Sequence, residues 1–353
     1  MKIVKVTLVS VLIVMLSACN LNGSLKNTEN KNVRNASTVR NQNYEVIIDN
    51  LKYPWSIDLM DNTFYMTERD GNILEVTNGK LKRQKLKTNK PIVSTGEGGL
   101  LGFVLTPNFT QSNQAYTYHT YKVNGSLKNR IILIEKTING WREVKSILEG
   151  IPGGQIHNGG RLAIGPDNHL FITTGDTGHD ELAQNLKSLA GKILRINLNG
   201  TTPNDNPFPN SLIYSYGHRN SQGIAWTNDG SMYASEHGPS PMGGHDEINK
   251  IDPGKNYGWP IIIGDEKNEG MVTPLYQTGD ETWAPSGIKI NDRNEILISC
   301  LMGEKLIKYS ISDGKLDTVL DGVGRIRDVF LKDTAIYVIT SNGVNDKLLR
   351  ISN

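Results

Sequence analysis

Short runs of alternating apolar and polar residues recur from Tyr44 to the end of the chain. In each copy, one alternating run meets a turn rich in Asp, Asn or Pro, a second run follows, and a third comes after a glycine-bearing loop. An alternation with a period of two is typical of β-strands that bury one face. Six such copies occur, and they begin at Ile57, Phe103, Leu162, Ile224, Ile288 and Val329.

Six self-similar β units, spaced by about 40 to 65 residues, predict a repeat architecture. Four-stranded blades around a central axis account for the spacing and for the scarcity of helical patterns. We therefore predict that residues 44–353 form one all-β domain, a six-bladed β-propeller of four-stranded antiparallel blades. The extra strand at residues 44–48 is expected to pair with the last copy and close the ring. A pair of β-sandwiches is the alternative, but it would not repeat six times in register.

One helical pattern interrupts the β repeats, at residues 180–189. Asp180 is the expected N-cap and Gly191 the expected stop. We interpret this segment as a loop insertion over the third copy.

The first residues predict export. Two lysines precede an apolar run, residues 6–16, that is too short to span a bilayer as an ordinary membrane helix. The run leads into the sequence LSAC, ending at Cys19, which resembles the lipobox of bacterial lipoproteins. We predict a lipoprotein signal peptide at 1–18, lipidation of Cys19, a disordered polar tether at 19–43, and anchoring to the outer face of the cell membrane. A plain secretory signal is the alternative, and it also implies export.

Composition excludes several classes of function. With 38 basic and 36 acidic side chains the net charge is +2, so no strongly basic face predicts nucleic-acid binding. The sequence contains no HExxH zinc motif, GxSxG nucleophile elbow, Walker loop or dinucleotide fingerprint in a strand-turn-helix setting. Metalloprotease, serine-hydrolase and nucleotide-binding functions are therefore disfavoured.

The stretch HNGGRLAIGPDNHLFITTGD, which begins at His157, holds the first candidate chemistry. Two strand-like runs joined by a tight turn bring the ends of the stretch together, so His157 and Asp176 are expected to be neighbours. A histidine beside a carboxylate can act as a general base. A turn histidine and a turn aspartate without chemistry are the alternative.

Further polar residues stand directly ahead of the first strand of other copies. Equivalent positions on successive blades face one end of the axis, so these side chains are expected to surround a single pocket. Arg219 could stabilise an oxyanion, and the paired Arg325 and Arg327 suggest an acidic ligand, although salt bridges are the alternative for each. Together with His157, the predicted ring comprises Glu97, Arg219, Asn220, Trp283, Arg325 and Arg327.

Residues 235–260 are rich in possible metal ligands. The Gly238-Pro239 turn can expose main-chain carbonyls, and nearby carboxylates supply the hard oxygen atoms that calcium prefers. The carboxylates are Asp246, Glu247 and Asp252. The absence of any metal is one alternative. A zinc site is the other, and its ligands would be His237, His245 and Asp246.

Several motifs together resemble the glucose/sorbosone dehydrogenase family, the soluble aldose sugar dehydrogenases that use pyrroloquinoline quinone. The resemblance covers residues 44–353, follows the family's order and implies a six-bladed propeller, in agreement with the repeat count. The motifs are HNGGRLAIGPD, TTGD, SLAGKILRIN, YGHRNSQGIAW, SEHGP, DEIN, NYGWP and GRIRDV.

The resemblance implies a role for each residue of the predicted pocket. His157 would be the general base that removes the proton of the sugar's anomeric hydroxyl while hydride passes to the quinone. Asp176 would orient that imidazole. Arg219 would stabilise charge on the quinone oxygens, and Asn220 would hold the cofactor.

The resemblance also implies a calcium ion on the main-chain carbonyls of Gly238 and Pro239, which would polarise the quinone. Arg325 and Arg327 would grip the carboxylates of the cofactor. Glu97 and Trp283 are predicted to line the same site. Further, structural calcium is expected at Asp246, Glu247 and Tyr257.

Two departures from the family pattern affect the cofactor site. Glu97 stands where some members carry glutamine, which adds negative charge beside an anionic cofactor. Met302 occupies a place where other members carry a lysine, so one cation is missing, although Lys305 could compensate from the same loop. The loss of one cation is expected to weaken cofactor binding by about 1–3 kcal/mol.

The function predicted from the sequence is oxidation of an aldose to its lactone by an exported propeller with calcium-bound quinone. The expected partners are the aldose, an electron acceptor that the sequence does not identify, and the membrane through the N-terminal lipid alone. One alternative is a calcium-dependent lactonase, which would need carboxylates on the axis. Another is a non-catalytic propeller that binds extracellular sugar or protein.

Overall fold

The computed structural model describes residues 44–239 and 244–351. The predicted signal peptide (1–18), the lipidation site Cys19 and the tether (19–43) lie outside the described residues. Within the described part of the chain, no helix is long and apolar enough to cross a membrane.

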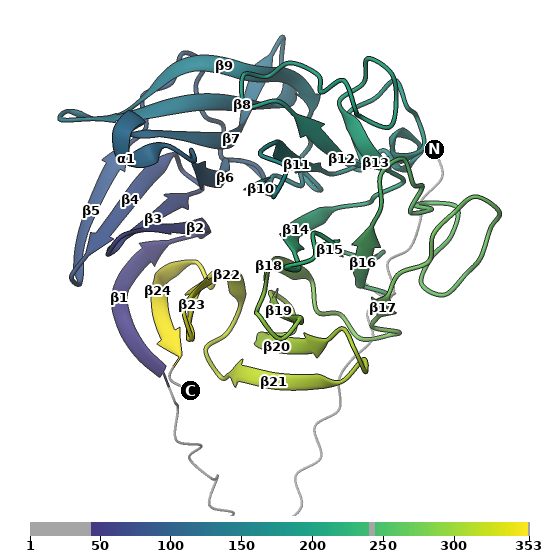
Figure 1. Ribbon diagram of the computed structural model, residues 1–353. Coiled ribbons are helices and arrows are strands. Elements are labelled where there is room, and N and C mark those ends of the chain that lie inside the picture. Colours follow the sequence, from purple (N-terminus) through teal and green to yellow (C-terminus); the bar gives the residue numbers. More distant parts are fainter. Residues whose placement is uncertain (1–43, 240–243, 352–353) are drawn as a thin grey trace, which may run out of the picture. The chain divides into compact units, whose positions relative to one another are not determined.

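The described residues form six sheets of four antiparallel strands, arranged in a ring around a central axis (Figure 1). The prediction of a six-bladed β-propeller is confirmed. Each of the six predicted starting residues falls in the innermost strand of a blade, and these strands surround the axis (Figure 1). The innermost strands are β2 (Pro54–Met60), β6 (Leu100–Leu105), β10 (Leu162–Ile164), β14 (Ser221–Trp226), β18 (Pro285–Ile290) and β22 (Ile326–Lys332).

The remaining strands follow outward in chain order within each blade. In the first three blades they are β3 (Thr63–Glu68), β4 (Asn72–Thr77), β5 (Lys80–Lys85), β7 (Gln114–Val123), β8 (Ser126–Thr137), β9 (Gly140–Pro152), β11 (Leu170–Thr174), β12 (Lys192–Ile196) and β13 (Ile213–Tyr216). In the last three they are β15 (Met232–Glu236), β16 (Glu247–Ile251), β17 (Tyr276–Gln277), β19 (Glu295–Cys300), β20 (Lys305–Ser310), β21 (Leu316–Asp321), β23 (Ala335–Thr340) and β24 (Val344–Ile351).

The last blade contains both ends of the described chain. Its outermost strand is β1 (Tyr44–Lys52), which pairs antiparallel with β24 in a register that sets Tyr44 opposite Ile351. The predicted ring closure is therefore confirmed, and the closing strand is longer than the alternating pattern at residues 44–48. Pairing covers the edge of β24 that would otherwise be open.

Hydrophobic clusters fill the spaces between neighbouring blades. Between the first two blades, Trp141 is completely buried and packs against the rings of Tyr65, Phe103 and Phe109. Its indole donates a hydrogen bond to Glu75 Oε1 at 3.0 Å, which satisfies its one polar atom. Adjacent blades are thus joined mainly by apolar packing, and the polar ends of the inner strands are free for other roles.

The predicted helix at residues 180–189 is wrong in length and start. A 3₁₀-helix, η1 (Asp180–Ala183), is present instead; it begins after His179, and no side chain caps it. Lys192 explains its early end, because the buried ammonium donates hydrogen bonds to the carbonyls of Leu182, Ala183 and Ala190 at 2.6 to 2.9 Å. These carbonyls are turned toward the lysine, so the chain curls around a side chain and does not continue as a helix. A short α-helix that the sequence pattern did not predict, α1 (Phe109–Ser112), precedes β7.

Candidate active site

The hairpin of β10 and β11 brings His157 and Asp176 together. Leu162 pairs with Ile172, so the segments before β10 and after β11 lie side by side. His157 Nδ1 lies 2.7 Å from Asp176 Oδ1, which confirms the predicted proximity. This hydrogen bond favours the tautomer with the proton on Nδ1 and leaves Nε2 with a free lone pair. The pair has the geometry of a general base with its orienting acid.

His157 is held in a left-handed backbone conformation, with φ of +51°. Such a conformation is uncommon for residues other than glycine and costs on the order of 1–3 kcal/mol. The backbone N–H of His157 donates to Glu97 Oε2 at 2.8 Å, and its carbonyl accepts from the Thr177 N–H at 3.2 Å. Gly175 passes so close that a Cβ there would collide with that carbonyl. Glu97 thus holds the backbone of the candidate base.

Asp176 is completely buried and its carboxylate is bound from three directions. Besides His157, the Gly178 N–H donates to Oδ1 at 2.8 Å and the Trp259 indole donates to Oδ2 at 2.9 Å. Burial alone would raise the pKa of the Asp176 carboxyl, but the hydrogen bond and charge of His157, the Gly178 N–H and the charge of Arg219 outweigh it and lower the pKa. The carboxylate is therefore charged and immobile beside the imidazole.

Arg219 and Asn220 adjoin this pair and carry unused hydrogen-bonding groups. The Arg219 carbonyl accepts from the Asp176 N–H at 2.8 Å, and its guanidinium lies over the Trp259 ring, 5.3 Å from the centroid. Asn220 Oδ1 accepts from the Gly159 N–H at 3.0 Å. Arg219 Nε and Asn220 Nδ2 are buried and have no partner in the structure. Buried polar groups without a partner are rare, so these two donors indicate a polar ligand.

A cavity of about 280 Å³, which we call the arginine cavity, opens at the same end of the inner strands. Three arginines and one carboxylate line it, so its charge is 3 − 1 = +2. Burial and the positive charges of Arg325, Arg69 and Arg161 lower the pKa of the Arg327 guanidinium to about 9. The cavity therefore favours an anionic ligand. Its lining residues are Trp55, Arg69, Glu97, Asn158, Gly159, Gln222, His237, Ala284, Leu301, Met302, Arg325 and Arg327.

A second, water-sized cavity of about 10 Å³ lies where β15 ends and β16 begins. Gly238 and Pro239 line it, together with Glu236 and Glu247, which face each other across the two strands. Burial and the charge of Glu236 raise the pKa of the Glu247 carboxyl to about 8. Both carboxylate oxygens of Glu236 already accept hydrogen bonds, Oε1 from the Arg219 N–H and Oε2 from His218 and Ser221. The hard oxygen donors that remain around this space are those of Glu247 and the main-chain carbonyls of Gly238 and Pro239, which are of the kind that calcium prefers.

Other predicted metal ligands are engaged elsewhere. Asp246 binds the backbone N–H groups of Gly238, Trp283 and Ala284 at 2.6 to 2.9 Å, and thereby fixes the Gly238 turn. The Tyr257 hydroxyl donates to the Lys250 carbonyl at 2.7 Å. His245 binds Gln277, and no three His, Cys, Asp or Glu side chains of the described residues gather as a metal cluster. The zinc ligands considered from the sequence therefore do not converge.

Comparison with known proteins agrees with this geometry. The family described as Glucose / Sorbosone dehydrogenase matches residues 51–350. The chain belongs to the glucose/sorbosone dehydrogenase family. Membership supports an oxidoreductase of the glucose or aldose dehydrogenase type.

Three relatives illustrate the range of the glucose/sorbosone dehydrogenase family. The aldose sugar dehydrogenase YliI of Escherichia coli (strain K12) is 30% identical over 88% of this chain and 92% of its own. Quinoprotein glucose dehydrogenase B of Acinetobacter calcoaceticus is 32% identical over 71% of this chain and 60% of its own. The structure of the PQQ-bound aldose sugar dehydrogenase of Streptomyces coelicolor superimposes with a TM-score of 0.79 at 31% identity, covering 88% of this chain and 98% of that one.

Not every residue that the resemblance places at the cofactor lies in the arginine cavity of this family member. The Trp283 side chain is 4% exposed and stacks on Tyr276 in a hydrophobic cluster, while its neighbour Ala284 lines the cavity. Lys305 lies over the Trp283 ring, 5.3 Å from the centroid, and does not line the cavity. Met302 does line the cavity. Lys305 is therefore not positioned to supply the positive charge that a lysine in place of Met302 would provide.

Residues that sequence reasoning missed include Arg69, Gln222 and Trp259. Arg69 follows β3, the second strand of its blade, and Asp176 follows β11, the second strand of another. The first strand runs away from the site and the second returns to it, so the turn after each second strand lies at the site. This signal was available in the sequence. TERDG ends the second alternating run of the first copy, just as TTGD ends the second alternating run of the third copy.

A buried Ser-His-Glu arrangement stabilises the wall of the site and is not a hydrolase triad. Ser215 Oγ lies 2.8 Å from His218 Nε2, and His218 Nδ1 lies 2.8 Å from Glu236 Oε2. Ser215 and His218 are completely buried, so the hydroxyl cannot reach a substrate. Glu236 also accepts a hydrogen bond from the Arg219 N–H, and the network therefore fixes the position of Arg219.

Proposed function

We propose that this protein is a quinoprotein that oxidises aldose sugars at the anomeric carbon to lactones, with calcium-bound pyrroloquinoline quinone as the hydride acceptor. The observation that carries the proposal is the His157–Asp176 pair beside the arginine cavity. A general base next to a net positive cavity suits a reaction in which a hydroxyl loses a proton and an anionic cofactor takes a hydride.

The residues present fit an anionic quinone. Arg327 Nε and His237 Nε2 are buried without partners and belong to residues that line the arginine cavity. Arg69, Arg325 and Arg327 would meet the carboxylates of pyrroloquinoline quinone, and Asn220 Nδ2 would donate to the same ligand. Each such contact would satisfy a donor that the protein alone leaves unpaired or exposed.

His157 Nε2 would accept the proton of the anomeric hydroxyl, and Asp176 would stabilise the imidazolium that results. As that O–H bond breaks, the hydride leaves the anomeric carbon and the carbonyl of the lactone forms. Bound pyrroloquinoline quinone supplies the site that receives the hydride. Arg219 would stabilise the negative charge that develops nearby, with its guanidinium held by Trp259 and the His237 carbonyl.

Calcium would be held by the main-chain carbonyls of Gly238 and Pro239, with Glu236 and Glu247 as neighbouring charges, and would supply Lewis-acid polarisation of the quinone. Asp246 would act on this site through the Gly238 turn. Tyr257 lines the same small cavity, although its hydroxyl is occupied by Lys250.

Reconstitution tests the proposal. Purified apoprotein supplied with calcium and pyrroloquinoline quinone is expected to reduce an artificial electron acceptor when an aldose is added. His157→Ala is expected to abolish turnover while quinone binding, followed by its absorbance, is retained. Quinone binding without turnover in the unaltered protein would favour a binding propeller, and a protein that binds no quinone would contradict the proposal. Lactone hydrolysis with calcium alone would favour the lactonase.

We also propose that the mature protein is exported and held at the outer face of the cell membrane by lipid on Cys19. The sequence LSAC supports this. Cys19→Ala is expected to prevent incorporation of labelled fatty acid and to release the protein from membranes. Incorporation that persists in the variant would contradict it.

A further inference from the structure

The inner strands line a second cavity, at their other end from the arginine cavity. Along β2, Trp55 lines the arginine cavity, whereas the following residues line a cavity of about 560 Å³. The same change occurs along β22, where Arg327 lines the first cavity and Asp328 lines the second. We call the second one the basal cavity. It is walled by the inner strands of the blades, and no predicted site residue lines it.

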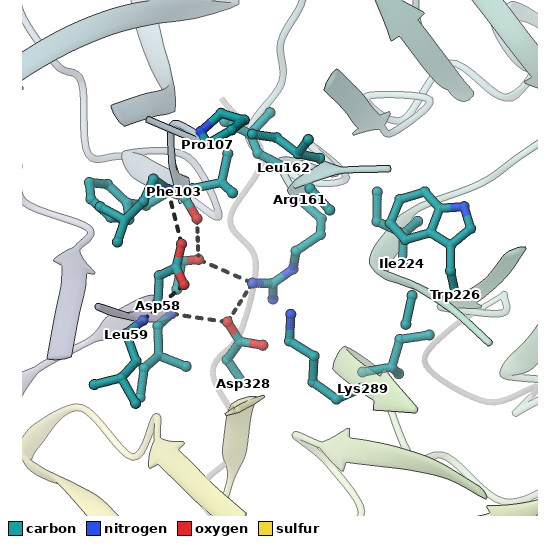
Figure 2. A pocket seen from close by; sticks show the side chains of 18 of the residues that line it. Asp58, Leu59, Phe103, Pro107, Arg161, Leu162, Ile224, Trp226, Lys289 and Asp328 are labelled. Atoms are coloured by element: carbon teal, nitrogen blue, oxygen red, sulfur yellow. Dashed lines mark hydrogen bonds and ion pairs between the residues drawn. The ribbon is translucent and has the colours of Figure 1, made fainter. Parts of the chain in front are cut away.

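A buried ion pair forms the floor of the basal cavity (Figure 2). Arg161 Nη1 lies 2.6 Å from Asp328 Oδ2, and both residues are more than nine-tenths buried. Asp328 also accepts hydrogen bonds from the Ile57 and Val329 N–H groups at 3.1 and 3.0 Å. Arg161 Nε donates to the Gln222 carbonyl at 2.8 Å. The acceptors of the floor are thus well occupied.

The hydrogen-bonding capacity that remains is that of donors. Arg161 Nη2 has no hydrogen-bond partner in the structure. Water cannot readily take that place, because Arg161 is only 6% exposed. Lys289 reaches into the cavity from the opposite wall (Figure 2), and no described carboxylate forms an ion pair with it. Its ammonium lies 5.6 Å from the centroid of the Phe330 ring. Asp58, the remaining acid of the cavity, already accepts from the Leu59 and Leu105 N–H groups at 2.8 and 2.9 Å.

Most of the residues around these donors are apolar, although polar backbone and side-chain atoms share the wall surface with them. The apolar lining residues include Leu59, Val104, Leu105, Ile164, Trp226 and Ile290. The volume lies within the range of about 300–1,000 Å³ that is common for small-molecule sites. Apolar walls with a few convergent polar groups are typical of a site that binds the apolar body of a ligand and orients its polar end.

We propose that the basal cavity is a second ligand-binding site, which takes a small organic carboxylate with an apolar body. The carboxylate would accept hydrogen bonds from Arg161 Nη2 and Lys289, and the body would lie against the apolar walls. A charge-assisted hydrogen bond from Arg161 would satisfy a donor that is otherwise buried without a partner.

This site is physically separate from the arginine cavity. Trp55 lies between the two, with the Arg161 guanidinium 4.3 Å and the Arg327 guanidinium 5.8 Å from its ring centroids. Gln222 touches both sides, because its backbone carbonyl binds Arg161 and its side-chain oxygen binds Arg327 Nη1 at 2.7 Å. Occupancy of the basal cavity therefore does not require the cofactor, and it can be measured on the apoprotein.

Titration of the apoprotein with hexanoate, followed by calorimetry and by Trp226 fluorescence, tests the proposal. Hexanamide is the neutral isostere, and Trp226→Phe identifies the part of the fluorescence change that reports on this cavity. Lys289→Gln removes one of the two donors, and Lys82→Gln is the matched control because Lys82 is exposed on the outer strand β5.

We expect saturable hexanoate binding, binding of hexanamide at least tenfold weaker, and affinity that rises on the order of threefold for each methylene added to the acid. Lys289→Gln is expected to weaken hexanoate binding at least tenfold, and Lys82→Gln to leave it unchanged. Equal binding of acid and amide would overturn the proposal, as would equal binding by the two lysine variants. The absence of a Trp226-dependent signal would place any bound carboxylate elsewhere and would also overturn it.

Discussion

The arginine cavity and the basal cavity are lined by the same inner strands, but they differ in whether the buried arginine has a carboxylate partner. At the basal end, Arg161 has a carboxylate partner in Asp328 and a single unused nitrogen. Around the arginine cavity, Arg327 has no ion pair among the described residues, and its charge is opposed by three other arginines. A paired charge stabilises the fold without a ligand, whereas an unpaired one is stabilised when an anion binds. The contrast therefore distinguishes Arg161, whose charge is balanced within the fold even when the basal cavity is empty, from Arg327, whose charge would be balanced only by a bound anion.

The largest effect is expected from a substitution of Asp176, the acid that orients the candidate base His157. Asp176→Asn keeps the shape of the side chain but removes the charge that holds His157 in its productive tautomer and stabilises the imidazolium. The kcat of the reconstituted enzyme is expected to fall by about 10²- to 10⁴-fold. Hexanoate binding at the basal cavity should not change. Steady-state kinetics measures the change in kcat, and calorimetry measures hexanoate binding. A kcat within threefold of that of the unaltered protein would show that the His157–Asp176 pair is structural.

The next largest effect separates the two buried arginines. Arg161→Gln leaves Asp328 buried without its partner and is expected to lower the free energy of unfolding of the apoprotein by about 3–5 kcal/mol. Arg327→Gln removes an unpaired buried charge and is expected to leave that free energy unchanged or higher. Chemical denaturation measures both. Arg142→Gln is the control, because its exposed pair with Glu135 should contribute less than about 1 kcal/mol. Equal destabilisation by Arg161→Gln and Arg327→Gln would remove the distinction.

Cofactor affinity gives the complementary measurement. Loss of one charge-assisted hydrogen bond in Arg327→Gln is expected to weaken quinone binding by about 1.5–3 kcal/mol, or roughly 10- to 150-fold. Titration of the apoprotein with pyrroloquinoline quinone in the presence of calcium gives the dissociation constant. The control variant Arg293→Gln changes an exposed residue that does not line the cavity, and it should bind the quinone normally. Unchanged affinity in Arg327→Gln would contradict the proposed cofactor position.

The smallest effect concerns pH. The pKa of Asp176 is lowered in the folded protein, so its charge contributes stability that is fully present above the ordinary carboxyl pKa of about 3.9 and is lost as pH falls through the folded value. The difference in unfolding free energy between the unaltered protein and Asp176→Asn is therefore expected to shrink between pH 5 and pH 2. A difference that grows on acidification over this range would contradict the sign of the shift.

Sequence reasoning was sufficient where backbone periodicity determines position. The hairpin pattern located His157 beside Asp176 because strand pairing fixes which chain segments are adjacent, whatever their side chains. The number of repeats predicted the ring, because each of six equivalent sheets can bury both of its faces only if it packs between two neighbouring sheets. Arg325 and Arg327 lie in the arginine cavity for the same reason: they stand directly before and within an inner strand.

It was insufficient where the direction of a side chain decides its role. The backbone of Trp283 reaches the expected place, but its ring packs into a cluster between blades and only Ala284 lines the cavity. The helix at residues 180–189 failed because Lys192, beyond the pattern, draws the carbonyls of that segment toward its ammonium. Trp259 could not be connected to Asp176, 83 positions away, because no local pattern encodes a contact between loops of different blades.

The pairing of β1 with β24 also sets an order of events. Tyr44 is among the first residues of the domain to be synthesised and its partner Ile351 is among the last, so the ring remains open until nearly the whole domain has been made. Contacts between such distant parts of a sequence form slowly, because a long loop must first close. A chain that stops before Val344 would leave β1 as an unpaired edge. The final strand therefore acts as a check on completeness, and truncated copies are expected to be unstable and prone to proteolysis.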